Sequence, residues 1–144
     1  MFHSGKRLRL LSTLLVLGWC LGSAAPAWAN LPFYSIVQQV CKSYRVPVTM
    51  KQMDLEESGD NGATFTLALQ SRRNNFEEVI LVGYVAASQA IARTGIEIKT
   101  INITVTIPKA DNMLLMTTAD VALVEQLRLG KIKSSQFMQK LEWN

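Results

Sequence analysis

The sequence holds few of the side chains that carry nucleophilic and metal chemistry. Its 144 residues include one histidine, His3, and two cysteines, Cys20 and Cys41. His3 and Cys20 both lie in an N-terminal segment with the features of a cleavable export signal. We therefore expect the remaining chain to have no histidine and one cysteine. That composition excludes a Ser-His-Asp triad, a Cys-His pair, a histidine-containing zinc site and an internal disulfide.

The export signal is predicted over residues 1–29. Three basic residues precede an apolar run over residues 10–22, and Ala27-Trp28-Ala29 fits the small-residue cleavage pattern. We predict cleavage after Ala29, which leaves residues 30–144 as a single domain in the periplasm or outside the cell. An uncleaved N-terminal anchor is the alternative.

Cleavage would also remove most of the net positive charge. The whole chain has 15 Lys and Arg residues, 11 Asp and Glu residues and a formal net charge of +4. Residues 1–29 contain three of the basic residues and none of the acidic ones, so the remainder has 12 basic and 11 acidic residues and a net charge of +1. A nucleic-acid or membrane-surface site needs a basic excess, so we expect neither partner.

The longest largely apolar segment, residues 74–95, predicts a helix at the centre of the fold. Asn75 is expected to cap its N-terminus, and Gly95 to end it in the left-handed conformation. Its apolar stretch of about 14 residues is shorter than the roughly 20 that a membrane span needs. One face carries small side chains that allow a sheet or helix to come close: Gly83, Ala86, Ala87 and Ala90.

The flanking segments predict strands and amphipathic helices that cover the central helix. An apolar stripe from Phe33 to Tyr44 indicates a first helix, with Cys41 as a small buried side chain. Thr118 is expected to cap a helix over 119–129, and a short last helix follows. The predicted strands are residues 48–57 and 63–70, joined at Asn61-Gly62, then 96–107 and 113–117, the last apolar on both faces.

These elements predict an α+β fold in the order α-ββ-α-ββ-αα, with an antiparallel sheet of about four strands packed on the long central helix. The sheet face away from that helix is the main candidate for a binding site. Solvated sheet faces usually carry charges that prevent association. Here strand alternation places uncharged polar side chains on that face: Thr64, Thr66, Gln70, Asn102, Thr104 and Thr106.

Three interpretations of this uncharged face remain open. Another chain covers it, the first and last helices cover it, or the threonines reflect β-propensity alone. A separate and weaker candidate is an anion site at Arg72 and Arg73, which precede the N-terminus of the central helix. Its alternative is a solvated loop whose charges offset Glu77 and Glu78. No metal site and no cofactor are predicted.

The shortage of catalytic residue types favours a function other than catalysis. We expect a small exported binding or adaptor domain that acts through contacts with a protein partner or through self-association. The alternative is a carrier of a small apolar ligand held between the central helix and the sheet. A hydrolase that uses carboxylates or a lone Ser or Tyr ranks third.

Overall fold

The computed structural model describes residues 30–57, 62–72, 74–108 and 112–144. The predicted export signal and Asn61 therefore lie outside the described residues. The helices are α2 (Leu31–Ser43), α3 (Phe76–Thr94), α4 (Val121–Arg128) and α5 (Ser134–Lys140), with a short 3-10 turn η2 (Met50–Gln52). The strands are β1 (Met53–Glu57), β2 (Ala63–Gln70), β3 (Ile98–Ile107), β4 (Met113–Asp120) and β5 (Glu142–Trp143).

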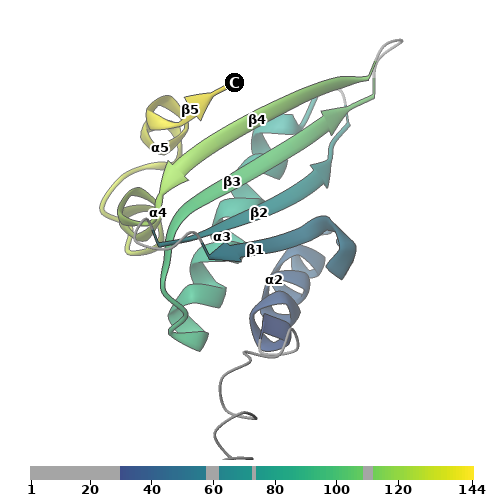
Figure 1. Cartoon of the computed structure of the whole chain (residues 1–144). Helices are drawn as coiled ribbons and strands as arrows, with labels where there is room; N and C mark the ends of the chain where they lie inside the picture. The colour runs from purple at the N-terminus through teal and green to yellow at the C-terminus, as the bar shows by residue number, and fades with distance from the viewer. Residues whose placement is uncertain (1–29, 58–61, 73, 109–111) are drawn as a thin grey trace, which may run out of the picture.

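The five strands form one mixed sheet in the order β1-β2-β3-β4-β5 (Figure 1). β2 and β3 run parallel, and the other neighbouring pairs run antiparallel. The central pair is parallel because α3 carries the chain back along the sheet between the two strands. The predicted α+β class is confirmed. The sheet has five strands and a parallel centre, where four antiparallel strands were expected.

All four described helices lie on the same side of this sheet, behind the strands in Figure 1. α3 packs on β2 and β3, α2 packs beside α3, and α4 and α5 pack against α3 near β4. The opposite side of the sheet has no described helix over it. The first and last helices therefore do not cover the candidate face, which removes one of the three interpretations.

The close approach of α3 to the sheet depends on Gly83. A Cβ atom at this position would lie 3.0 Å from Leu69 Cδ1 and 3.1 Å from Ile103 Cδ1. Larger side chains at this point would push the helix away from the two central strands. The middle of the interface proposed for an apolar ligand is thus filled by side chains of the sheet. Nearby, Phe33 of α2 packs edge-on against Phe65 of β2, with ring centres 4.9 Å apart.

A buried polar link joins α3 to β4. Thr117 donates its hydroxyl to the carbonyl oxygen of Ile103 at 3.1 Å. Its one proton is thereby used, so the hydroxyl of Tyr84, 2.9 Å away, donates to Thr117 Oγ1. Phe137 of α5 packs edge-on against the Tyr84 ring at 5.1 Å between centres. Burial raises the pKa of Tyr84 above its ordinary value, although the hydrogen bond to Thr117 opposes this shift.

The two predicted side-chain caps differ from the observed ones. Asn75 makes no side-chain hydrogen bond to the first turn of α3; its Oδ1 instead accepts the backbone N–H of Arg72 at 2.7 Å. β4 continues to Asp120, so Asp120 and not Thr118 caps α4, with Oδ1 accepting from Leu123 N at 2.9 Å. The predicted stop of α3 is confirmed, because Gly95 is left-handed with φ 70°.

Candidate functional site: the open face of the sheet

Paired residues of neighbouring strands point to the same side of a sheet, so the register defines rows of side chains across it. We use the term open face for the four rows on the side without helices. They are Glu56–Thr64–Thr100–Asp120, then Asp54–Thr66–Asn102–Thr118–Glu142, then Ala68–Thr104–Met116, and last Gln70–Thr106–Leu114.

The structure brings all six predicted side chains together on this face. Thr64, Thr66, Asn102, Thr104 and Thr106 are partly exposed and Gln70 is exposed. They occupy the two central strands, β2 and β3. Thr118 of β4 extends this polar surface and donates its hydroxyl to Asn102 Oδ1 at 2.9 Å. The centre of the open face is therefore a continuous uncharged surface of short hydrogen-bonding side chains.

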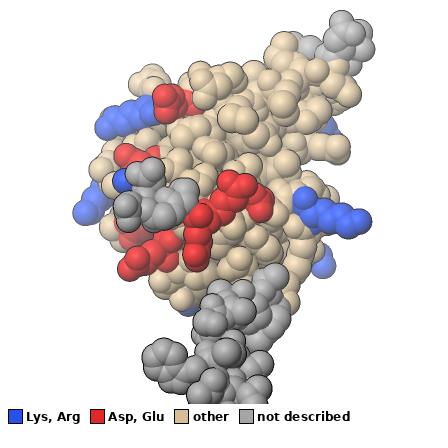
Figure 2. All heavy atoms as spheres, in the orientation of Figure 1, with Lys and Arg blue, Asp and Glu red and all other residues tan. Residues whose placement is uncertain are grey.

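Acidic side chains flank one end of the open face. Asp54 and Glu56 project from β1 at one edge, and Asp120 and Glu142 project from the opposite edge. Figure 2, which views this side of the molecule, shows Asp and Glu gathered over part of it. The four rows contain no Lys or Arg. Asp54 and Glu56 alternate with apolar residues in β1, so the sequence alone could have placed them on this face. The predicted strand 48–57 hid this pattern, because η2 (Met50–Gln52) interrupts it and β1 begins only at Met53.

The other end of the open face carries exposed apolar side chains on β4. Leu114 is 63 % exposed and Met116 is 38 % exposed, and both lie in the last two rows. The prediction that residues 113–117 are covered on both faces is wrong, because the helices pack on one side only. Met116 exchanges two backbone hydrogen bonds with Asn144, at the edge of β4 that pairs with β5. By strand alternation, the backbone N–H and C=O of Leu114 face the same edge, at a point that the pairing with β5 does not reach.

The remaining candidate residues are placed as follows. Arg72 is exposed at the end of β2, and Arg73 lies outside the described residues. Cys41 is fully buried, and burial raises the pKa of its thiol to about 11. In the part of the chain that the structure describes, no cluster of three or more His, Cys, Asp or Glu side chains could hold a metal ion.

Two further findings bear on the class of protein. None of the helices in the described ranges is long and apolar enough to cross a membrane. Comparisons of the chain with protein-family models, curated proteins and solved structures gave no match.

Proposed function

We propose that this chain is an exported, non-enzymatic binding domain that holds a partner protein on its open face. The observation that carries the proposal is the one-sided packing of the sheet. Four helices cover one face, and the other presents uncharged polar side chains next to exposed Leu114 and Met116. Exposed apolar side chains that adjoin an uncharged sheet surface favour association, because no charge opposes contact with another chain.

The charges on this face define the chemistry of the partner. A face-to-face dimer with two-fold symmetry would place the acidic rows either against each other or against the apolar end of the second copy. Both arrangements remove carboxylates such as Asp54 and Glu56 from water without a cation, which is costly. A different protein could pair its basic side chains with the acidic end of the open face and pack its apolar side chains on Leu114 and Met116. We therefore favour a basic partner over self-association.

Two substitutions of equal charge test this proposal. Thr104→Lys places a cation in the centre of the open face, and Gln39→Lys adds the same charge to an exposed position of α2.

A photo-cross-linking residue at position 104, introduced in cells, should trap one protein of defined mass. With that protein purified, Thr104→Lys should raise the Kd at least about tenfold, or roughly 1.4 kcal/mol. Gln39→Lys should leave the Kd unchanged.

The outcomes separate the alternatives. If the cross-linked adducts contain only a second copy of the chain, the open face mediates self-association and the proposed basic partner is wrong. Equal affinities for the two lysine variants, both folded as judged by circular dichroism, would contradict the proposal. A domain that loses its fold on Thr104→Lys would contradict the partly exposed position assigned to this residue, because solvated surface substitutions usually change stability by about 0.5 kcal/mol or less.

The proposed export has its own test. If the signal is cleaved after Ala29, the protein recovered from the exported fraction begins at Asn30, and its intact mass corresponds to residues 30–144. A product that retains Trp28 would contradict the cleavage site. The structure offers no observation that favours an apolar-ligand carrier, because Leu69 and Ile103 fill the space against Gly83.

A further inference from the structure

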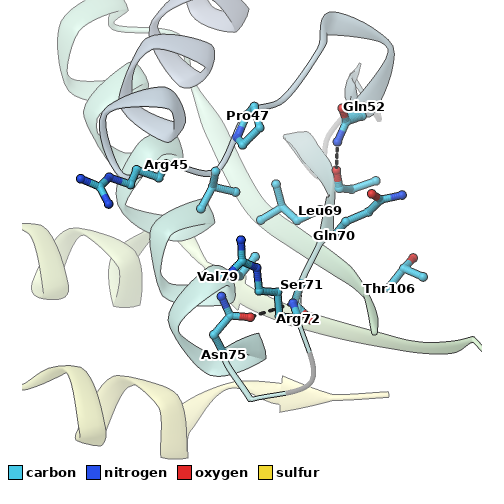
Figure 3. A pocket seen from close by; sticks show the side chains of 12 residues that line it. Arg45, Pro47, Gln52, Leu69, Gln70, Ser71, Arg72, Asn75, Val79 and Thr106 are labelled. Atoms are coloured by element: carbon cyan, nitrogen blue, oxygen red, sulfur yellow. Dashed lines mark hydrogen bonds between the residues drawn. The ribbon is translucent and has the colours of Figure 1, made fainter. Parts of the chain in front are cut away.

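A hollow of about 540 Å³ lies at one corner of the domain, between the end of α2, the edge of β2 and the start of α3 (Figure 3). β1 pairs with β2 only as far as Leu67, so the edge of β2 from Ala68 onward faces this space. The lining includes Arg72, the weaker candidate from the sequence. It also includes Gln70 and Thr106 from the last row of the open face.

Hydrogen-bond donors converge on this hollow. Asn75 Oδ1 accepts from the backbone N–H of Arg72, so its amide group keeps two N–H donors for a ligand. Ser71 donates its backbone N–H to Thr106 O at 3.1 Å, so strand alternation turns the N–H of Gln70 away from β3, toward the hollow. Figure 3 shows the Arg72 side chain extending from the end of β2 toward α2.

The hydroxyl of Ser71 is the strongest indication that the hollow takes a ligand. This residue lines the hollow, is only 8 % exposed, and its Oγ has no hydrogen-bond partner among the described residues. A buried hydroxyl without a partner loses its hydration without compensation, so such groups are rare in folded proteins. The Oγ atom is itself buried, so the hydroxyl has to turn about the Cα–Cβ bond to meet a ligand oxygen in the hollow.

The charges around the hollow favour an anion. Arg45 and Arg72 belong to its lining, which includes no Asp or Glu. Neither arginine forms an ion pair within residues 30–57, 62–72, 74–108 and 112–144. The first turn of α3 adds the positive end of a 19-residue helix, whose first amides receive no side-chain cap from Asn75. Glu77 and Glu78 of this turn are exposed and do not line the hollow.

Arg45 supports the same conclusion through its backbone. It ends α2 at φ 62°, a left-handed conformation that glycine normally adopts. Arg45 N bonds to Lys42 O at 3.0 Å and Val46 N to Cys41 O at 2.9 Å, the two bonds of a Schellman stop. An arginine therefore occupies a position where glycine would be less strained. Figure 3 shows its guanidinium at the rim, turned outward, where an exposed side chain can rotate over the opening.

We propose that this hollow binds the phosphate group of a ligand. Arg72, the amide of Asn75, the hydroxyl of Ser71 and the backbone N–H of Gln70 lie around the hollow, and donors from several directions suit a tetrahedral oxyanion better than a planar carboxylate. Arg45 at the rim adds long-range attraction. This site is centred on the sheet edge beyond β1 and shares Ala68, Gln70 and Thr106 with the open face.

Titration of the purified protein with inorganic phosphate tests the proposal. In ¹⁵N-resolved NMR spectra, the amide signals of Gln70, Arg72 and Asn75 should shift and saturate with a Kd of about 1 mM or below. Acetate at the same ionic strength is the control for a planar carboxylate and should bind at least about tenfold more weakly. Equal binding of both anions, or no saturable shift with phosphate, would overturn the proposal.

Three variants assign the contacts. Arg72→Gln should weaken phosphate binding at least about tenfold, whereas Arg93→Gln, the same charge change at the far end of α3, should leave it unchanged. Ser71→Ala should weaken binding about threefold or more and raise the Tm of the phosphate-free protein, since it removes an unpartnered hydroxyl. Arg45→Gly should likewise raise the Tm while weakening binding, because it relieves the left-handed strain.

These paired readouts exclude a purely structural role. A residue needed only for folding would lower the Tm when replaced, so a fall in Tm for Ser71→Ala or Arg45→Gly would contradict the proposal, as would unchanged binding in Arg72→Gln.

Vesicles of phosphatidylglycerol distinguish the source of the phosphate group. Cosedimentation that inorganic phosphate reverses would assign it to a lipid headgroup, and binding of dissolved phosphate without cosedimentation would assign it to a soluble ligand.

Discussion

The two faces of the sheet are built from the same strands but differ in composition, burial and charge. On the helix side, Phe65, Leu67, Ile101, Ile103 and Val105 are fully buried. On the open face, the residues between them are threonine, asparagine, alanine and glutamine, with carboxylates at one end and Leu114 and Met116 at the other. One face holds the fold together and the other is available for contact, because alternate side chains of a strand point to opposite sides.

This difference separates two kinds of uncharged side chain. Isoleucine and valine on the helix side gain stability from burial against α3. Threonine on the open face has nearly the same shape and the same preference for strands, yet no described helix lies over it. Substitutions one residue apart should therefore affect either stability or binding, and the predictions below compare such positions.

Ile103 and Thr104 give the largest expected contrast. Ile103→Ala removes a fully buried side chain that packs against α3 at Gly83, and the resulting cavity should lower the free energy of unfolding by about 3 kcal/mol. Thr104→Ala, on the next residue, should change it by about 0.5 kcal/mol. Urea denaturation followed by circular dichroism measures both. Similar losses for the two variants would show that the open face is also packed.

Cys41 tests the burial of the first helix. Cys41→Ala should cost roughly 1 kcal/mol or slightly more as a small truncation in the core. A thiol reagent should label the native protein slowly and the urea-unfolded protein rapidly. Because burial raises the thiol pKa to about 11, Cys41 stabilises the fold fully below its unfolded pKa and loses that contribution as the pH rises toward 11. Rapid labelling of native protein would refute the buried position.

The Tyr84–Thr117 link should have a smaller effect at neutral pH and a larger one in alkali. Tyr84→Phe removes one buried hydrogen bond, while Thr117 keeps its bond to Ile103 O, so the cost should be about 1 kcal/mol. The folded-state pKa of Tyr84 is raised, so its stabilising contribution is complete below the unfolded pKa and falls as the pH rises above about 10. Alkaline unfolding curves should therefore be flatter for Tyr84→Phe than for the parent.

Much of this fold was predictable because its hydrophobic periodicity is strong. The stripe of the first helix, the length of α3 and the alternation of β2 and β3 all appear in the sequence as regular apolar spacings. The parallel pairing of β2 with β3 did not, because strand direction depends on how α3 crosses the sheet and not on local spacing. β5 has two residues, too few for a periodic pattern.

The candidate sites were less predictable, for a related reason. Alternation placed Thr104 and its neighbours on one face, but whether a helix covers that face depends on tertiary packing. Arg72 was recognisable beside a helix start, whereas Arg45 lies almost thirty residues away and meets the same hollow only through the stop of α2. The unpartnered hydroxyl of Ser71 leaves no mark in sequence, since any loop contains serine.

The smallest expected effect concerns the open face itself. Thr118→Val removes the hydroxyl that donates to Asn102 Oδ1 at 2.9 Å but keeps the β-branched shape, so its cost should be about 0.5 kcal/mol. Thr66→Val is the matched control in the same row, since its hydroxyl has no hydrogen bond to a described residue. It should be neutral. A cost above about 1 kcal/mol for Thr118→Val would mean that the uncharged surface stabilises the fold, and would weaken the argument that it is kept for contact with a partner.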